Sequence, residues 1–69
     1  MEIIYSDHAK KRMKQRGIED WEIEHALKFP SYIKNYSNKK REAIAEIKNR
    51  KIKIIFIKLE NYIKIITVY

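Results

Sequence analysis

The chain has 69 residues, with 16 lysines and arginines against 9 aspartates and glutamates, so its formal net charge is +7 at pH 7. This length predicts one domain spanning residues 1–69, and the absence of cysteine excludes disulfides and thiolate metal sites. His8 and His25 alone cannot build a structural zinc site, and we expect neither a metal nor a cofactor. The apolar runs are too short for a membrane span or a signal peptide, which predicts a cytoplasmic protein without membrane contact.

The positive charge is concentrated in the C-terminal half. Residues 1–30 carry six basic and six acidic side chains, whereas residues 31–69 carry ten basic and three acidic ones. A basic surface of this kind favours polyanionic partners, either nucleic acid or an acidic protein segment.

Two helices are predicted within the first thirty residues. Ser6 is a good N-cap for a helix over residues 7–16, and Gly17, the only glycine, stands where a helix C-terminus favours a left-handed residue. A second helix is expected over residues 19–29, with acidic side chains at its start and Pro30 after its end. The short connection makes the two helices a hairpin.

Strands are predicted in the remainder, where β-branched residues dominate. They are expected near residues 32–36, 43–47, 52–59 and 62–68. A polar loop is expected at residues 37–40, and turns at Asn49–Arg50 and Glu60–Asn61. Because these connections are short and the helices come first, the sequence predicts an α+β domain in which the helical hairpin packs on a three- to four-stranded antiparallel sheet.

The first helix presents one stripe of chemistry-bearing residues. At 100° per residue His8, Arg12 and Arg16 share a face, which we call the His8 stripe, and it adjoins the apolar pair Ala9 and Met13. In one interpretation the arginines pair with acids of the second helix and His8 only begins the helix. In the other, the two guanidinium groups hold a phosphodiester while a neutral His8 acts as base on a ribose hydroxyl.

The second helix has two apolar stripes on opposite sides. The better core candidates are Ile23, Ala26 and Leu27. The opposite stripe contains Trp21 and Phe29, with His25 between them as a bystander, and one sheet cannot cover both stripes. We therefore expect Trp21 and Phe29 to form a partner interface, with a second copy in a homodimer or with an acidic partner. The alternative is that Trp21 folds over a sheet edge and Phe29 packs under the Pro30 turn.

Basic side chains also follow the predicted strands. They are Lys51, Lys53, Lys58 and Lys64. This alternation is typical of a solvated sheet face, and it also suits a surface that follows an RNA backbone. In the second case Tyr32, Tyr36 or Tyr62 would stack on bases.

The two ends of the chain together resemble a known pattern. The run His8-Ala-Lys-Lys-Arg-Met-Lys-Gln-Arg-Gly-Ile18, followed by Ile23 and Ala26–Leu27, and the ending Ile65-Ile-Thr-Val-Tyr69 resemble a family of small uncharacterised domains. That family opens with His, three residues, Arg, Met or Leu, two residues, Arg and Gly, and it ends with Ile-Thr-Val-Tyr. It is similar to the RelE and BrnT toxins of toxin–antitoxin modules, which share two N-terminal helices on an antiparallel sheet and cleave RNA without a metal.

The resemblance implies a RelE-like fold and a metal-independent endoribonuclease that cleaves RNA by attack of the 2′-hydroxyl. His8 would carry the proton, Arg12, Arg16 and Arg41 would hold phosphate, and Tyr69 would donate a hydrogen bond or act as acid. It also implies an acidic antitoxin protein as partner. Two other functions stay open: a non-catalytic basic module that binds nucleic acid or an acidic protein, and an oligomeric structural protein joined through Trp21 and Phe29.

Overall fold

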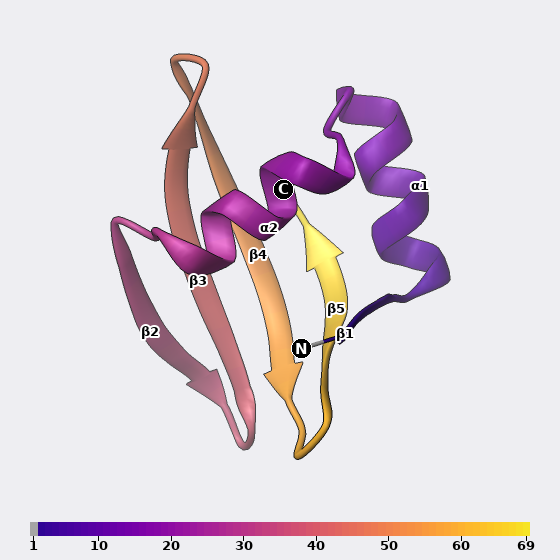
Figure 1. Ribbon diagram of the computed structural model, residues 1–69, viewed down its shortest axis with the longest axis vertical. Helices are drawn as coiled ribbons and strands as arrows, with labels where there is room; N and C mark the ends of the chain where they lie inside the picture. Colours follow the sequence, from indigo (N-terminus) through magenta and orange to yellow (C-terminus); the bar gives the residue numbers. More distant parts are fainter. Residues whose placement is uncertain (1) are drawn as a thin grey trace.

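The computed structural model describes residues 2–69, and the side chain of Tyr36 lies outside its described part. The elements in chain order are β1 (Glu2–Tyr5), α1 (Asp7–Arg16), α2 (Asp20–Lys28), β2 (Tyr32–Ser37), β3 (Lys40–Ile47), β4 (Arg50–Lys58) and β5 (Tyr62–Val68) (Figure 1).

The strands form one mixed sheet with the order β1-β5-β4-β3-β2. Strands β2 to β5 are antiparallel neighbours, whereas β1 runs parallel to β5, with Ile3 opposite Ile63. The predicted sheet of three to four antiparallel strands is therefore wrong, because residues 2–5 add a fifth, parallel strand. Both helices and three strands separate β1 from β5, which is ample length for a parallel connection. The α+β class is confirmed.

A bulge in β5 explains how β1 leads into α1. Ile55 pairs with Thr67 and Phe56 with Ile65, so Ile66 is the extra residue of β5. The Ser6 hydroxyl donates to the carbonyl of Ile66 at 2.7 Å, and the same oxygen accepts the Ala9 N–H at 3.0 Å as N-cap of α1. Ser6 therefore caps the start of α1 and also supplies a hydrogen bond to the carbonyl of the bulge residue Ile66.

The helices match the prediction closely. Helix α1 spans the predicted residues and ends at Gly17, whose φ of 65° is left-handed. Helix α2 is one residue shorter at each end than predicted, and at its start the Glu22 carboxylate accepts the Glu19 N–H at 2.9 Å. Within residues 2–69, no helix is long and apolar enough to cross a membrane.

The connections between the strands differ from the prediction: the β2–β3 turn is shorter, the β3–β4 turn is shifted by one residue, and residues 59–61 instead of 60–61 connect β4 to β5. Asn38 and Lys39 alone connect β2 to β3, and Lys48 and Asn49 connect β3 to β4. Three of these four residues, Asn38, Lys48 and Asn49, have positive φ between 46° and 64°. Because Lys48 is left-handed, the second turn begins one residue before the predicted Asn49–Arg50.

Both helices cover the same face of the sheet, which we call the helix face. In Figure 1, α2 crosses in front of β3 and β4 while α1 stands beside β5. Ala9, Met13, Ile23 and Ala26 of the helices pack in one core with residues of the sheet. The sheet residues of this core are Ala43, Ala45, Ile47, Ile52, Ile54, Phe56, Ile65 and Val68. Ile44 and Ile55 are also buried but belong to the opposite, open face.

Arg50, at the start of β4, ties the β3–β4 hairpin to the α1–α2 turn. Its guanidinium donates to the carbonyls of Arg16 and Gly17 at 2.8 and 2.9 Å, and to the Glu22 carboxylate at 3.1 and 3.2 Å. Glu22 is fully buried. The Glu19 N–H, together with Arg50, holds the pKa of Glu22 below its usual value although burial opposes this.

Candidate nucleic-acid interface

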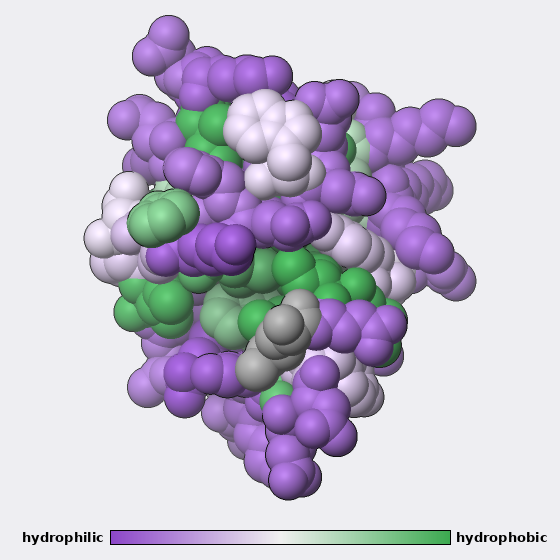
Figure 2. Space-filling view, in the orientation of Figure 1, coloured by the Kyte–Doolittle hydropathy of each residue, from purple (hydrophilic) through white to green (hydrophobic). Residues whose placement is uncertain are grey.

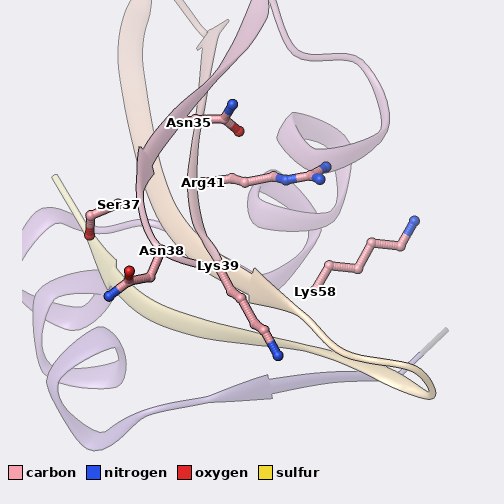
Figure 3. Close-up of a pocket in the computed structure, with 6 residues that line it drawn as sticks. All are labelled: Asn35, Ser37, Asn38, Lys39, Arg41 and Lys58. Carbon is pink, nitrogen blue, oxygen red and sulfur yellow. The ribbon is translucent and has the colours of Figure 1, made fainter.

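A basic cavity lies on the helix face at the end of the sheet where β2 turns into β3. Its volume is about 420 Å³. The residues that line it are Asn35, Ser37, Asn38, Lys39, Arg41 and Lys58, and none of them is acidic. Figure 3 shows that Asn35, Arg41 and Lys58 point to the same side, that Lys39 lies at the strand end, and that Ser37 and Asn38 point away from the other three. The cavity therefore offers two cations and an amide on one side, with a third cation at its edge.

Strand register brings these side chains together. Asn35 is opposite Arg41, and Arg41 is opposite the core residue Phe56. Lys58 follows Phe56 by two residues and therefore projects from the same face. Among the residues that the structure describes, Lys39, Arg41 and Lys58 make no ion pair, so their charge remains available to an anion.

An apolar cavity adjoins the basic one. Its volume is about 190 Å³, and its lining consists of Leu27, Ile33, Arg41, Phe56, Lys58 and Ile63. Arg41 and Lys58 line both cavities. Ile33 is 46% exposed on the edge strand β2. Figure 2 shows hydrophobic surface below α2, in the part of the helix face that the helices leave open.

The open face carries a buried carboxylate. Glu42 is only 3% exposed, accepts a hydrogen bond from the Tyr69 hydroxyl and pairs with the Lys34 ammonium at 3.3 Å. The Tyr69 side chain spans β4, because β4 lies between β3 and the C-terminal end of β5. The Lys53 ammonium lies 5.5 Å from the Tyr69 ring centroid. The Tyr69 hydrogen bond, followed by Lys34, lowers the pKa of Glu42 although burial opposes this.

The five predicted catalytic residues occupy three places. His8, Arg12 and Arg16 are exposed along α1, and neither of the cavities that Arg41 lines includes them. Arg41 is on the helix face, whereas Tyr69 pairs through its backbone with Lys53 and contacts Glu42 on the open face. The structure thus places Arg41 and Lys58 in the lining of one cavity on the helix face. Tyr69 lies on the opposite side of the sheet. Among the described residues, no ion pair joins the two stripe arginines to an acid of α2.

The four predicted nucleic-acid-binding lysines divide between the faces. Lys51, Lys53 and Lys64 belong to the open face, since they alternate with the core residues of β4 and β5, and Lys58 belongs to the helix face. Tyr32 and Tyr62 are on the open face, where Tyr32 is exposed, and the side chain of Tyr36 lies outside the described part.

The outer side of α2 is exposed as expected, with Trp21 at 48% and Phe29 at 68% exposure. The Trp21 Nε1–H donates to the Glu19 carboxylate at 2.8 Å, and the Lys48 ammonium lies 5.0 Å from the Trp21 ring centroid. The rings of His25 and Phe29 are 5.2 Å apart. A partner that covers this side stays a prediction.

Sequence reasoning missed three parts of these sites: Asn35 and Lys39 of the basic cavity, the apolar cavity, and the contact of Glu42 with Tyr69. The run Lys39-Lys40-Arg41 beside a predicted loop is a signal that points to the basic cavity. Nothing in the sequence indicates the other two, because both depend on strand register. Among the described residues, no group of three or more His, Asp or Glu could hold a metal ion.

Comparisons with known proteins match the chain to one kind of domain. Residues 5–69 match the model of the family DUF4258, which is described as a domain of unknown function. No curated protein and no solved structure matches the chain.

Proposed function

We propose that this chain, which belongs to the DUF4258 family, binds RNA through the phosphate backbone. The observation that carries this proposal is the basic cavity, in which Arg41, Lys58 and Lys39 stand without an acidic neighbour in the lining. A guanidinium group can hold two phosphate oxygens at once, and the Asn35 amide adds a neutral donor beside it. The net charge of +7 strengthens the attraction to any polyanion. The opening and ending motifs resemble a family of small domains that is similar to RNA-cleaving toxins, and this resemblance favours RNA over DNA.

The test compares two charge-matched double variants. Arg41→Gln with Lys58→Gln removes two charges from the helix face, and Lys51→Gln with Lys64→Gln removes two from the open face. Binding of a fluorescent single-stranded RNA is measured by anisotropy over a range of salt concentrations. We expect the helix-face variant to reduce the salt slope by about 1.4 units, the value for two lost phosphate contacts on a single strand.

The open-face variant is the control for net charge and should keep the slope of the parent protein. Equal losses in both variants would mean that total charge, and not the basic cavity, attracts the RNA. Binding that does not depend on salt would remove nucleic acid as the ligand and favour an acidic protein.

RNA cleavage is the second function that we propose, and the exposed His8 stripe supports it. In this mechanism His8 takes the proton of a 2′-hydroxyl, and the resulting oxygen attacks the adjacent phosphorus. The 5′-oxygen of the next nucleotide leaves with a proton from water, which gives a cyclic phosphate and a 5′-hydroxyl. Arg12 and Arg16 stabilise the charge on the phosphate oxygens. Water replaces Tyr69 as acid here because the Tyr69 hydroxyl is bonded to Glu42.

Cleavage is tested with purified protein, RNA and excess EDTA. We expect fragments that end in cyclic phosphate, and a decrease of about 100-fold or more in rate for His8→Ala and Arg12→Ala without a change in thermal midpoint. Lys11→Ala, an exposed change elsewhere on α1, is the control. Loss of cleavage in EDTA would eliminate this mechanism, and an Arg12→Ala variant that chiefly unfolds would assign the stripe to stability.

A further inference from the structure

The basic and apolar cavities form one composite site. They share Arg41 and Lys58, so a ligand whose anionic group contacts these two cations also borders the apolar lining. Leu27, Ile33, Phe56 and Ile63 provide that lining, and Ile33 is one of the exposed large apolar residues of the molecule. The ligand that fits has a negative charge and an uncharged, largely apolar group a short distance apart.

The size of the apolar cavity limits that group to about one ring. An engineered apolar cavity of roughly 150 Å³ accepts one benzene molecule. The cavity of about 190 Å³ beside Arg41 is somewhat larger. A nucleobase is flat, presents an apolar face, and is joined to its phosphate through a single sugar.

We propose that the two cavities together hold one unpaired nucleotide of an RNA strand, with its phosphate on Arg41 and Lys58 and its base against Ile33 and Leu27. This inference rests on the proposed RNA binding. An RNA strand supplies a phosphate with every base, so charge and ring always come at the close spacing that adjoining cavities need. A base within a duplex is stacked and paired, and its face is not accessible to such a cavity.

The first experiment separates the base from the backbone. A short oligouridylate, the same strand annealed to its complement, and an abasic strand with the same number of phosphates are compared at one low salt concentration. Uracil has a single ring, and a strand of uridine alone stacks weakly and lacks the adenines needed for pairing, so its bases stay accessible. We expect the single strand to bind about tenfold more tightly than the abasic strand, because the abasic strand keeps the phosphates but lacks the base that buries apolar surface on Ile33 and Leu27.

The second experiment tests the apolar lining. Ile33→Ser changes an exposed isoleucine of the apolar cavity, and Ile4→Ser is its matched control, a 39% exposed isoleucine on the other edge strand and the open face. We expect Ile33→Ser to weaken oligouridylate binding about fivefold or more and to leave the abasic strand unaffected. Thermal midpoints of both variants show whether either change disturbs folding, and Leu27→Ala replaces Ile33→Ser if that variant unfolds.

The outcomes distinguish this inference from the function on which it rests. If all three probes bind equally and Ile33→Ser has no effect, the base site is wrong while RNA binding stands. If none of the three probes binds, both fail. The third outcome is that an acidic peptide containing leucine binds, that Ile33→Ser abolishes this binding, and that the RNA probes bind the variant as before. In that case the composite site belongs to a protein partner and the inference is overturned.

Discussion

Tyr69 shows how a single neighbour determines what a side chain can do. The family resemblance implies that Tyr69 donates a hydrogen bond or acts as acid at a phosphate, but in the structure the hydroxyl donates to Glu42 across β4. A phenol in this position must break that bond before it can protonate anything else. Its role in the present structure is to satisfy a carboxylate that is buried on the open face.

Replacing this hydroxyl is expected to destabilise the fold. Tyr69→Phe keeps the ring and leaves Glu42 with Lys34 as its remaining partner, so we expect a loss of about 2 kcal/mol in the free energy of unfolding at neutral pH. Tyr62→Phe, which removes the hydroxyl of a partly buried tyrosine at the start of β5, is the control. Urea unfolding followed by fluorescence measures both. A Tyr69→Phe protein as stable as its parent would mean that water replaces the phenol without cost.

The same contact predicts how stability depends on pH. The pKa of Glu42 is lower in the folded state than its ordinary value of 4.5, so the ionised carboxylate stabilises the fold above that value. This contribution disappears as pH falls through the lower, folded pKa, and Glu22 behaves in the same way. Stability should therefore decrease below about pH 4.5, and it should decrease less in Tyr69→Phe, whose Glu42 pKa lies nearer the unfolded value. Parallel acid curves for the two proteins would contradict this.

Among the elements, those with local end signals were predictable. Ser6 and Gly17 define α1, and Pro30 bounds α2. The prediction for residues 62–68 is confirmed by β5. Strand β1 has only four residues, and its partner lies about sixty positions along the chain, so no local pattern reveals the pairing.

The site follows the same rule. Arg41 and Lys58 are predicted separately as phosphate-contacting residues, but only the β3–β4 register shows that they share a cavity.

The contact of Arg50 with the α1–α2 turn is expected to stabilise the fold by holding the β3–β4 hairpin against the helices. Arg50→Ala removes four hydrogen bonds and leaves Glu22 buried without its cation. Removing one partner of a buried pair costs about 3–5 kcal/mol, and since the Arg50 side chain is partly exposed we expect about 2 kcal/mol. Thermal unfolding measures the loss, and Lys51→Ala is the adjacent control.

A double variant separates the buried charge from the other contacts. Glu22→Gln in the Arg50→Ala background removes the unpaired carboxylate, so the double variant should be more stable than Arg50→Ala alone. If the two losses simply add, the arginine acts through the carbonyls of Arg16 and Gly17 and not through Glu22.

At the scale of the whole molecule, the two sheet faces are completed differently. The open face is covered by its own side chains, with Tyr69 spanning β4 and both Ile44 and Ile55 buried. The helix face is covered by two helices that leave the composite cavity open at one end. The outer side of α2, with Trp21 and Phe29, belongs to neither sheet face and is exposed. A domain of 69 residues has little stability in excess, so these uncovered apolar groups carry a cost that a partner can offset.

We expect the Trp21 and Phe29 side of α2 to be covered by a second copy of the chain at high concentration. A partner that binds only the folded state raises the apparent stability by mass action, so the thermal midpoint should fall when the protein is diluted. The Trp21 ring lies against Lys48 and Glu19, and covering it should also shift its fluorescence emission. Trp21→Ser should give a midpoint that no longer depends on concentration, whereas Tyr32→Ser, a change at another exposed aromatic residue, should retain the dependence. If emission, midpoint and mass in solution stay constant on dilution, self-association through this side is wrong, and an acidic partner remains the occupant only if adding one shifts the Trp21 emission.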